Sequence, residues 1–358
     1  TDEVCDHYKV PNNYLELLIK ASDMLLNTGF LEHSDVSLYR LRSNEQIAGY
    51  LYYVLAEEYA RFILSLKKTK KGKMFVKQSK VIELIMQDKM FSDTSDINDL
   101  NMLETSQQVS YKGHRGMNTE RAFSLDKRSY SESMNGIITG STGFAGNVGM
   151  DRQIALNAKI KSTRGYLDEV EKTKNEDLSL GDLSATDAMI ALTTSSDDPF
   201  RQLMGYLQRN KHFLPTEVSD PPLITTGMDM AIPYMTKNRF SIVSKDSGVV
   251  EELNEDYMLI RYDNGKKDMF NMKPHSIKDS AGGMYLELKY IKKKKKGSKF
   301  KAGEIIAYDK KSYSNEAGDL SYTFGTLTKV AILNTNESYE DACKISHDLS
   351  EKMSSVII

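Results

Sequence analysis

Two adjacent carboxylates near the C-terminal end of the chain, Glu340 and Asp341, are the first candidates for chemistry. Carboxylate oxygens are the ligands that Mg²⁺ and Ca²⁺ prefer, so this pair could hold a divalent ion, directly or through water. Acidic residues also stabilise the positive end of a helix, and an amphipathic stretch follows them. From the residues alone, a helix cap remains the simpler interpretation.

Two arginines, Arg201 and Arg209, stand in the stretch 199–211, where Pro199 predicts the first turn of a helix. Their spacing is slightly more than two helical turns, so both guanidinium groups would project from one face, about 12 Å apart along the axis. A planar guanidinium matches the oxygens of a phosphate. A solvated basic side on a surface helix is an equally good interpretation.

Three further basic residues, Lys112, Arg115 and Arg121, lie in or beside a loop that also carries Gly113 and Gly116. Glycine lets a backbone approach a phosphate closely, and the basic side chains supply the opposite charge. The loop could therefore contact phosphate or nucleic acid, but from the residues alone a solvated turn is the simpler interpretation.

A second glycine-rich stretch, 140–149, surrounds Asn147. A nucleotide-binding P-loop would continue with Lys-Ser or Lys-Thr, whereas Asp151 and Arg152 follow here. The stretch is better explained as a structural turn that supports a neighbouring site.

Helices are predicted in two parts of the chain. Apolar residues recur at helical spacing in the first ninety or so residues, and again in two shorter segments. The predicted helices cover about 15–26, 47–63, 75–90, 184–191 and 199–211. Between these two parts, residues 92–150 are rich in Ser, Thr, Asn and Gly and lose helical periodicity, which predicts an irregular functional loop.

The C-terminal part is predicted to be β-rich. Its segments are short, rich in β-branched and aromatic residues, and separated by turn residues such as Asp263-Asn264-Gly265. The predicted strands are FSIVS, GVVEEL, YMLIRY, MYLEL, EIIAY and KVAILN. Helices followed by strands predict an α+β fold with a barrel or sandwich at its end.

Composition narrows the function further. The 358 residues carry a net charge of −2, so binding of nucleic acid would depend on local patches or on partner chains. No apolar run approaches the roughly 18 residues that cross a membrane. Cys5 and Cys343 are far apart and form no zinc motif. We therefore expect a cytoplasmic protein without a membrane partner.

Taken in order, several stretches resemble the β subunit of bacterial-type, multisubunit DNA-dependent RNA polymerase. They cover about residues 95–358. The resembling stretches are LNMLETSQQVSYKGHRGMNTERAFSLDKRSY (the fork loop), NVGMDRQI, DDPFRQLMGYLQRNKHFLP, PLITTGMDMAI, SGVVEELNEDYMLIRYDNG and KVAILNTNESYEDACKIS. The Arg-x-Leu-Met-Gly helix and Tyr-Glu-Asp-Ala are the most specific.

The resemblance implies a fold in four regions. An N-terminal helical, lobe-like region is followed by an irregular fork-loop and hybrid-facing region, a helical substrate-side segment and a β-rich, hybrid-binding region. The last region would form part of a double-psi β-barrel completed by another chain. The expected boundaries are 1–92, 93–180, 181–222 and 223–358.

The resemblance also implies roles for single residues. Arg201 would reach the triphosphate of the incoming nucleotide, and Arg209 would lie near the RNA 3′ end. Asn147 would contact the RNA–DNA hybrid. The remaining roles belong to Lys112, Arg115 and Arg121 at the downstream DNA fork, and to Glu340 and Asp341 beside the second Mg²⁺ of a two-metal phosphoryl transfer.

Departures from the family pattern predict a divergent enzyme. The family's Gly-Pro-Gly-Gly is Gly113-His114-Arg115-Gly116 here, and its Glu-Thr-Pro-Glu-Gly has lost both acids. Such drift resembles the polymerases of large bacteriophages, whose large subunits are split among several chains. Such a chain would work in the cytoplasm of the host cell.

The expected partners follow from that resemblance. They are a β′-type subunit that principally holds the Mg²⁺, other β-fragment chains including the flap part, the DNA template, the RNA–DNA hybrid and nucleoside triphosphates. The chain would be inactive alone as a DNA-directed RNA polymerase. The alternative is a non-catalytic nucleic-acid-binding or assembly factor that reuses the fold.

Overall fold

The chain was analysed as a computed structural model. It describes residues 2–7, 9–27, 43–88, 97–112, 128–130, 132–143, 145–160, 165–167, 178–192, 196, 204–206, 208–209, 213–236, 238–278, 285–316, 318–323, 325–334 and 342–355. These residues form helices and open sheets, which confirms the predicted α+β class.

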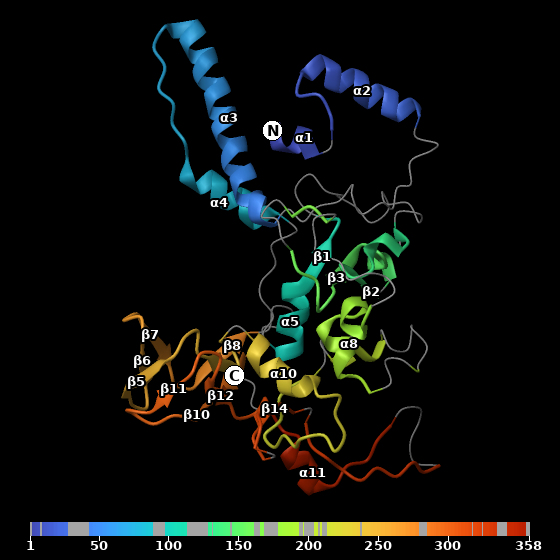
Figure 1. Cartoon of the computed structure of the whole chain (residues 1–358), viewed down its shortest axis with the longest axis vertical. Helices are drawn as coiled ribbons and strands as arrows, with labels where there is room; N and C mark the ends of the chain where they lie inside the picture. The colour runs from blue at the N-terminus through green and yellow to red at the C-terminus, as the bar shows by residue number, and fades with distance from the viewer. Residues whose placement is uncertain are drawn as a thin grey trace.

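Helices form the N-terminal part, as predicted, and lie at one end of the molecule (Figure 1). They are α1 (Asp2–His7), α2 (Tyr14–Leu26), α3 (Ser43–Thr69) and α4 (Gln78–Gln87). The side chain of Asn13 caps α2 by accepting a hydrogen bond from Leu15 N at 3.0 Å. An ion pair between Lys80 and Glu57 ties α4 to α3.

The prediction that residues 92–150 lack helix is wrong at α5 (Asp99–Gln107). Asn98 caps this helix by accepting a hydrogen bond from Asn101 N at 2.8 Å. Its apolar face consists of Leu100 and Leu103, both buried. Nine residues with only two buried leucines are too few for periodicity to reveal a helix, and tertiary packing supplies the stability instead.

A small antiparallel sheet follows α5 directly. Its strand order is β1-β3-β2, from β1 (Gln108–Ser110), β2 (Ile138–Thr142) and β3 (Asp151–Ile154). The short 3₁₀ helices η4 (Glu132–Met134) and η5 (Ala145–Asn147) flank β2. We call this unit the fork sheet, and buried side chains of Met134, Ile137, Ile138 and Leu167 pack beneath it.

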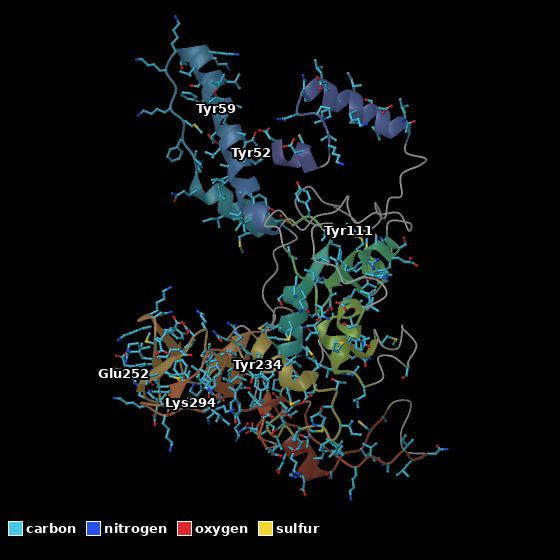
Figure 2. All side chains as sticks on the ribbon, viewed as in Figure 1. Tyr52, Tyr59, Tyr111, Tyr234, Glu252 and Lys294 are labelled. Atoms are coloured by element: carbon cyan, nitrogen blue, oxygen red, sulfur yellow. The ribbon has the colours of Figure 1, made fainter. Side chains whose placement is uncertain are left out.

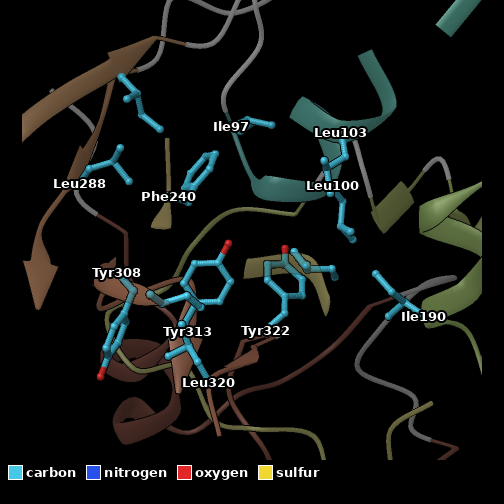
Figure 3. Packing of buried hydrophobic residues seen from close by; sticks show 13 residues of the cluster. Ile97, Leu100, Leu103, Ile190, Phe240, Leu288, Tyr308, Tyr313, Leu320 and Tyr322 are labelled. Carbon is cyan, nitrogen blue, oxygen red and sulfur yellow. The ribbon is translucent and has the colours of Figure 1, made fainter. Parts of the chain in front are cut away.

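The main hydrophobic core joins distant parts of the chain (Figure 3). Residues of α8 (Thr186–Ile190), α10 (Met228–Met235), β8 (His275–Lys278), β9 (Tyr285–Leu288), β13 (Tyr313–Ser314) and β14 (Ser321–Tyr322) contribute to it. Helix α7 (Leu180–Leu183) contacts β2 and α8 instead, and the C-terminal α11 (His347–Lys352) has no buried residue. Leu100 and Leu103 of α5 share this core with Phe240, Tyr313 and Tyr322. The predicted helix over 184–191 is confirmed as α8.

A β module with its own core occupies the C-terminal half. One sheet has the order β10-β12-β4 and the other β11-β5-β6-β7. The strands are β4 (Ser241–Val243), β5 (Gly248–Leu253), β6 (Tyr257–Tyr262), β7 (Lys267–Asn271), β10 (Tyr290–Lys292), β11 (Lys299–Phe300) and β12 (Ile305–Asp309). Ile306 and Ala307 of β12 face this core, whereas Ile305 and Tyr308 face the main core.

Most of the predicted strands are confirmed. FSIVS, GVVEEL, YMLIRY and MYLEL contain β4, β5, β6 and β9, and EIIAY covers β12 except for its last residue, Asp309. The predicted turn at Asp263-Asn264-Gly265 joins β6 to β7, and Gly265 adopts the left-handed conformation, with φ of 83°, that such hairpin turns require.

The predicted strand KVAILN is not a strand in this chain. Residues 325–334 have no regular structure, and the side chain of Ile332 is 98% exposed. A strand needs a neighbouring backbone for its hydrogen bonds, and no described strand pairs with this segment. The sheets described here are open and do not close into a barrel.

Among the described residues, no helix is both long enough and apolar enough to cross a membrane.

The carboxyl group of Asp99, at the start of α5, is completely buried and accepts a hydrogen bond from the Tyr313 hydroxyl. Burial raises the pKa of Asp99 well above its usual value; the Tyr313 hydrogen bond opposes the change, and the nearby Asp309 adds to it. Burial likewise raises the pKa of Asp309. The folded chain therefore binds a proton at this pair more tightly than the unfolded chain does.

We expect this proton to make stability fall as pH rises. The contribution of Asp99 is complete below its unfolded-state pKa, near 3.8, and is lost as pH rises through the higher folded-state pKa. Asp99→Asn keeps an oxygen for Tyr313 but never ionises. Its free energy of unfolding, measured by urea denaturation, should fall less between acidic and neutral pH than that of the wild type.

Because the pKa of Asp309 is also raised, the stability of Asp99→Asn should still fall somewhat as pH rises. Tyr313→Phe, which removes the donor from a buried acceptor, should lower stability by about 1–3 kcal/mol. Equal pH slopes in the wild type and Asp99→Asn would contradict the assignment.

Candidate nucleic-acid interface

The register of the fork sheet creates a polar cluster at the end of β1. Ser110 lies directly opposite Asp151 in the β1–β3 pair, and its hydroxyl donates to Asp151 Oδ1 at 2.5 Å. The Ser110 hydroxyl oxygen also accepts from the backbone N–H of Lys112 at 3.1 Å. These contacts bend the chain sharply after β1 and direct Lys112 back over the sheet. Tyr111, labelled in Figure 2, marks this position.

Two residues selected from the sequence, Lys112 and Asn147, meet in this cluster. The Lys112 ammonium donates to Asn147 Oδ1, although 35 positions separate them. It also lies 3.4 Å from Asp151 Oδ2. Lysine can only donate, so the oxygen of the Asn147 amide must face it. The two N–H donors of Asn147 then point away, and they reach no acceptor among the described residues.

That arrangement presents hydrogen-bond donors next to a positive charge. Such a combination suits an acceptor oxygen on a phosphate, a sugar or a base edge. Asp151 offsets part of the Lys112 charge, which makes the site more selective for hydrogen-bond geometry than for charge alone. We call Lys112, Asn147 and Asp151 the fork cluster.

A tight loop holds Asn147 in place. The Arg128 guanidinium donates to the carbonyl oxygens of Gly146 at 2.9 Å and of Val148 at 3.3 Å. The N–H of Gly149 donates to Thr142 Oγ1 at 2.6 Å. Gly149 has a φ of 74°, and a Cβ there would lie 2.4 Å from the Arg128 carbonyl oxygen. Only glycine satisfies both conditions.

Arg152 supports this loop from inside the fork sheet. Its side chain is only 5% exposed, and it donates to the Arg128 carbonyl oxygen at 2.6 Å. The guanidinium carbon lies 5.4 Å from the centre of the Tyr130 ring, a cation–π distance. Burial lowers the pKa of Arg152 and raises that of Tyr130. Arginine remains charged even so, because its ordinary pKa is so high.

Arg209 lies elsewhere. It falls in the predicted helix 199–211, of which the described residues 204–206 and 208–209 are helical. Its charge lies near Tyr322 in the main core and opposes the rise in the pKa of Tyr322 that burial causes. The other predicted site residues, Arg115, Arg121, Arg201, Glu340 and Asp341, lie outside the described residues.

Sequence reasoning missed Ser110, Arg128 and Arg152 as parts of this site. A buried arginine within a strand leaves one signal: a charged residue that interrupts the apolar alternation of a β-prone segment. That signal indicates a special position but does not identify the contacts, which depend on strand register.

The part of the chain that the structure describes contains no group of three or more His, Cys, Asp or Glu residues that could hold a metal ion. The proposed Mg²⁺ ligands are outside that part.

Comparison with known proteins gives two matches. Residues 1–120 match a family model for bacteriophage RNA polymerase. The chain is also 27% identical over 201 residues to a protein of Caldicellulosiruptor bescii named DNA-directed RNA polymerase subunit beta. The chain is similar in sequence to DNA-directed RNA polymerases.

The extent of each match is informative. The C. bescii match covers 54% of this chain but only 15% of that subunit, so the chain spans a small share of the relative's length. The family model covers residues 1–120 and so includes the N-terminal helices, whereas the resembling stretches described above begin near residue 95. The matches relate residues 1–120 and a stretch of 201 residues to RNA polymerases.

We expect the loop that presents Asn147 to tolerate no side chain at Gly149. Gly149→Ala would force a Cβ against the Arg128 carbonyl oxygen, and it should lower stability by roughly 1–3 kcal/mol. Urea denaturation, with hydrogen exchange of residues 145–154 as the local readout, would measure the effect. Gly140→Ala is the matched control, because a Cβ at Gly140 meets no atom within 4 Å. Equal losses in both variants would contradict the role of Gly149.

Proposed function

We propose that this chain is a fragment subunit of a divergent, split DNA-directed RNA polymerase of the kind found in large bacteriophages. One observation carries the proposal. Lys112 and Asn147, which the family resemblance assigns to the DNA fork and the RNA–DNA hybrid, contact each other across 35 positions of sequence. The two sequence similarities to RNA polymerases point to the same activity.

In this proposal the fork cluster holds nucleic acid near the fork. The Asn147 amide donates to the hybrid, and Lys112 supplies positive charge beside it. Arg152 and Arg128 act through the backbone of the loop and keep the amide oriented. Orientation matters because template-directed synthesis requires the hybrid to lie in a fixed register.

The nucleotide would be bound by other residues of the same chain. Arg201 would contact its triphosphate, Arg209 would lie near the RNA 3′ end, and Arg115 and Arg121 would border the fork. Glu340 and Asp341 would stand beside the second Mg²⁺, whose principal ligands would come from a β′-type partner. Bound Mg²⁺ supplies charge stabilisation for the leaving pyrophosphate.

Partner chains would complete the fold. The segment 325–334 has the composition of a strand, yet Val330, Ile332 and Leu333 are exposed and no described strand pairs with it. An exposed, β-prone apolar segment readily accepts a strand from another chain. We assign it to a double-psi β-barrel that another β-fragment chain completes.

The role of Asn147 can be tested without disturbing the fold. In Asn147→Asp, a carboxylate oxygen still accepts from Lys112, but the two outward N–H donors are lost. We expect the assembled polymerase to bind an RNA–DNA hybrid about tenfold more weakly, measured by its retention as salt is raised.

The control is Asn315→Asp, which adds the same charge at an exposed position away from the fork sheet. A purely structural Asn147 predicts wild-type retention in Asn147→Asp, and that result would contradict the proposed contact.

The assembly itself is tested by recovering the tagged full chain from its native source. We expect a β′-type chain and a chain with the flap part to co-purify. Ile332→Asp should lose the second chain, because a carboxylate would have to be buried in the completed barrel. Lys329→Gln, a neighbouring exposed position, should not lose it.

Recovery of neither partner with the wild-type chain would favour the alternative, a non-catalytic nucleic-acid-binding or assembly factor. Recovery of both with Ile332→Asp would contradict strand completion at this segment while leaving the polymerase assignment intact.

A further inference from the structure

The β module carries a concentration of lysines that the proposed function does not use. Residues 285–311 contain ten lysines and three acids, one of which is the buried Asp309, whereas the whole chain has a net charge of −2. Figure 2 locates the region through the labelled Lys294. Concentrated positive charge in a nearly neutral chain marks an interaction surface for an anion.

Strand register aligns cations across one sheet. Lys299 of β11 lies opposite Val249 of β5, Val249 opposite Arg261 of β6, and Arg261 opposite Lys267 of β7. Directly paired residues share a face, so these three cations form one row on the outer face. With neighbouring strands about 4.8 Å apart, the row spans roughly 14 Å. All three side chains are exposed.

A rigid turn adds two further lysines beside the row. Lys295 and Lys296 begin a turn in which Ser298 N donates to Lys295 O at 3.0 Å, and Gly297 adopts a φ of 82°. Gly297 N also donates to Val250 O at 2.8 Å, which joins the turn to β5. The exposed side chains of Lys295 and Lys296 therefore extend from a fixed backbone. We call Lys295, Lys296, Lys299 and Arg261 the cationic face.

The cationic face differs from nearby lysines that have partners within the chain. Lys294 pairs with Glu304, and Lys292 donates to Asn254 O at 2.7 Å. Lys267, at the far end of the row, pairs with Glu251 at 2.7 Å. The four residues of the cationic face form no ion pair with a described carboxylate. The pKa of Glu251 is lowered chiefly by its hydrogen bond to Lys267 and further by the charge of Arg261, so Glu251 offsets part of the Arg261 charge. The charges of Lys295, Lys296 and Lys299 are available to a ligand.

Protection of a sheet edge is the competing explanation, since lysines on edge strands discourage pairing with other chains. It accounts for Lys299, which stands on the edge strand β11. It does not account for Arg261, which stands on the interior strand β6.

We propose that the cationic face binds the phosphodiester backbone of nucleic acid without reading its sequence. Lysines act as point charges that contact phosphates, and the face offers few groups for base edges. A membrane surface is a poorer fit: Met269 is the one large apolar side chain among the described residues of the outer face of this sheet that is strongly exposed. Binding should then be strongly salt-dependent.

The proposal stands independently of the polymerase assignment, and the experiment keeps the two apart. Binding of the full chain to labelled duplex DNA, single-stranded DNA and an RNA–DNA hybrid is measured by fluorescence anisotropy between about 50 and 200 mM salt. The triple variant Lys295→Gln, Lys296→Gln, Lys299→Gln should bind at least tenfold more weakly. Its plot of log affinity against log salt should be shallower by up to about 3.

Two other variants sharpen the result. Arg261→Gln should also weaken binding, because it removes a charge from the cationic face. Edge protection predicts no such effect, since Arg261 is on an interior strand. Lys273→Gln is the matched control: Lys273 lies just after β7 and pairs with Asp256 at 3.4 Å. It should bind as the wild type does. Lys112→Gln in the same assay reports on the fork cluster separately.

The outcomes divide cleanly. A weaker triple variant with an unchanged control supports the cationic face, and the preferred nucleic acid identifies its natural ligand. Unchanged affinity and an unchanged salt slope in the triple variant overturn the proposal. It is also overturned if the wild-type chain binds anionic lipid vesicles and none of the three nucleic acids. If the triple variant aggregates more but binds nucleic acid as well as the wild type does, the lysines protect the sheet edge, and the proposed binding by the cationic face is overturned.

Discussion

The hydrogen bond between the Tyr313 hydroxyl and the buried Asp99 carboxyl group joins residues 214 positions apart, and the placement of the fork cluster depends on it. Asp99 begins α5, whose leucines lie in the main core, and α5 ends where β1 begins. The Thr186 hydroxyl donates to Gln107 Oε1 at 3.1 Å and so fixes that junction from α8. Because β1 leads directly to Lys112, the position of α5 in the main core determines where Lys112 lies. A polar group is costly to bury, yet this one specifies how the two parts of the chain fit together.

Elements specified by local sequence could be predicted, whereas elements that depend on tertiary contacts could not. Helix α3 and the β5–β6–β7 meander carry their own signal, because periodicity and the Asp263-Asn264-Gly265 turn are local properties. Helix α5 has almost no local signal, since its stability comes from a core built by residues far along the chain. For KVAILN the error is the reverse: a strand was predicted and none forms. Its composition indicates a strand, but a strand exists only where another backbone pairs with it. Residue types report a preference, and tertiary structure decides whether it is satisfied.

The candidate site divides in the same way. Residue types selected Lys112, because a lysine beside glycine is recognisable in the sequence. The motif resemblance selected Asn147, which lies in a glycine-rich stretch. Their contact depends on the β1–β3 register and on the turn at Gly149, neither of which is visible in the sequence. Arg152 was hidden for a further reason. A buried arginine is rare, and this one is tolerated because the Tyr130 ring and the Arg128 carbonyl oxygen replace the water that burial removes.

Two groups of residues that we propose contact nucleic acid therefore occur in one nearly neutral chain, and their chemistry differs. In the fork cluster, Asp151 balances Lys112, so the site has little net charge but firmly oriented donors. In the cationic face, Lys295, Lys296 and Lys299 form no ion pair with a described carboxylate. Oriented donors discriminate between geometries of a ligand, whereas unbalanced charges attract any phosphate backbone from a distance and lose that attraction in salt. In the proposed function the two would act together: the cationic face would raise the local concentration of nucleic acid, and the fork cluster would fix its position.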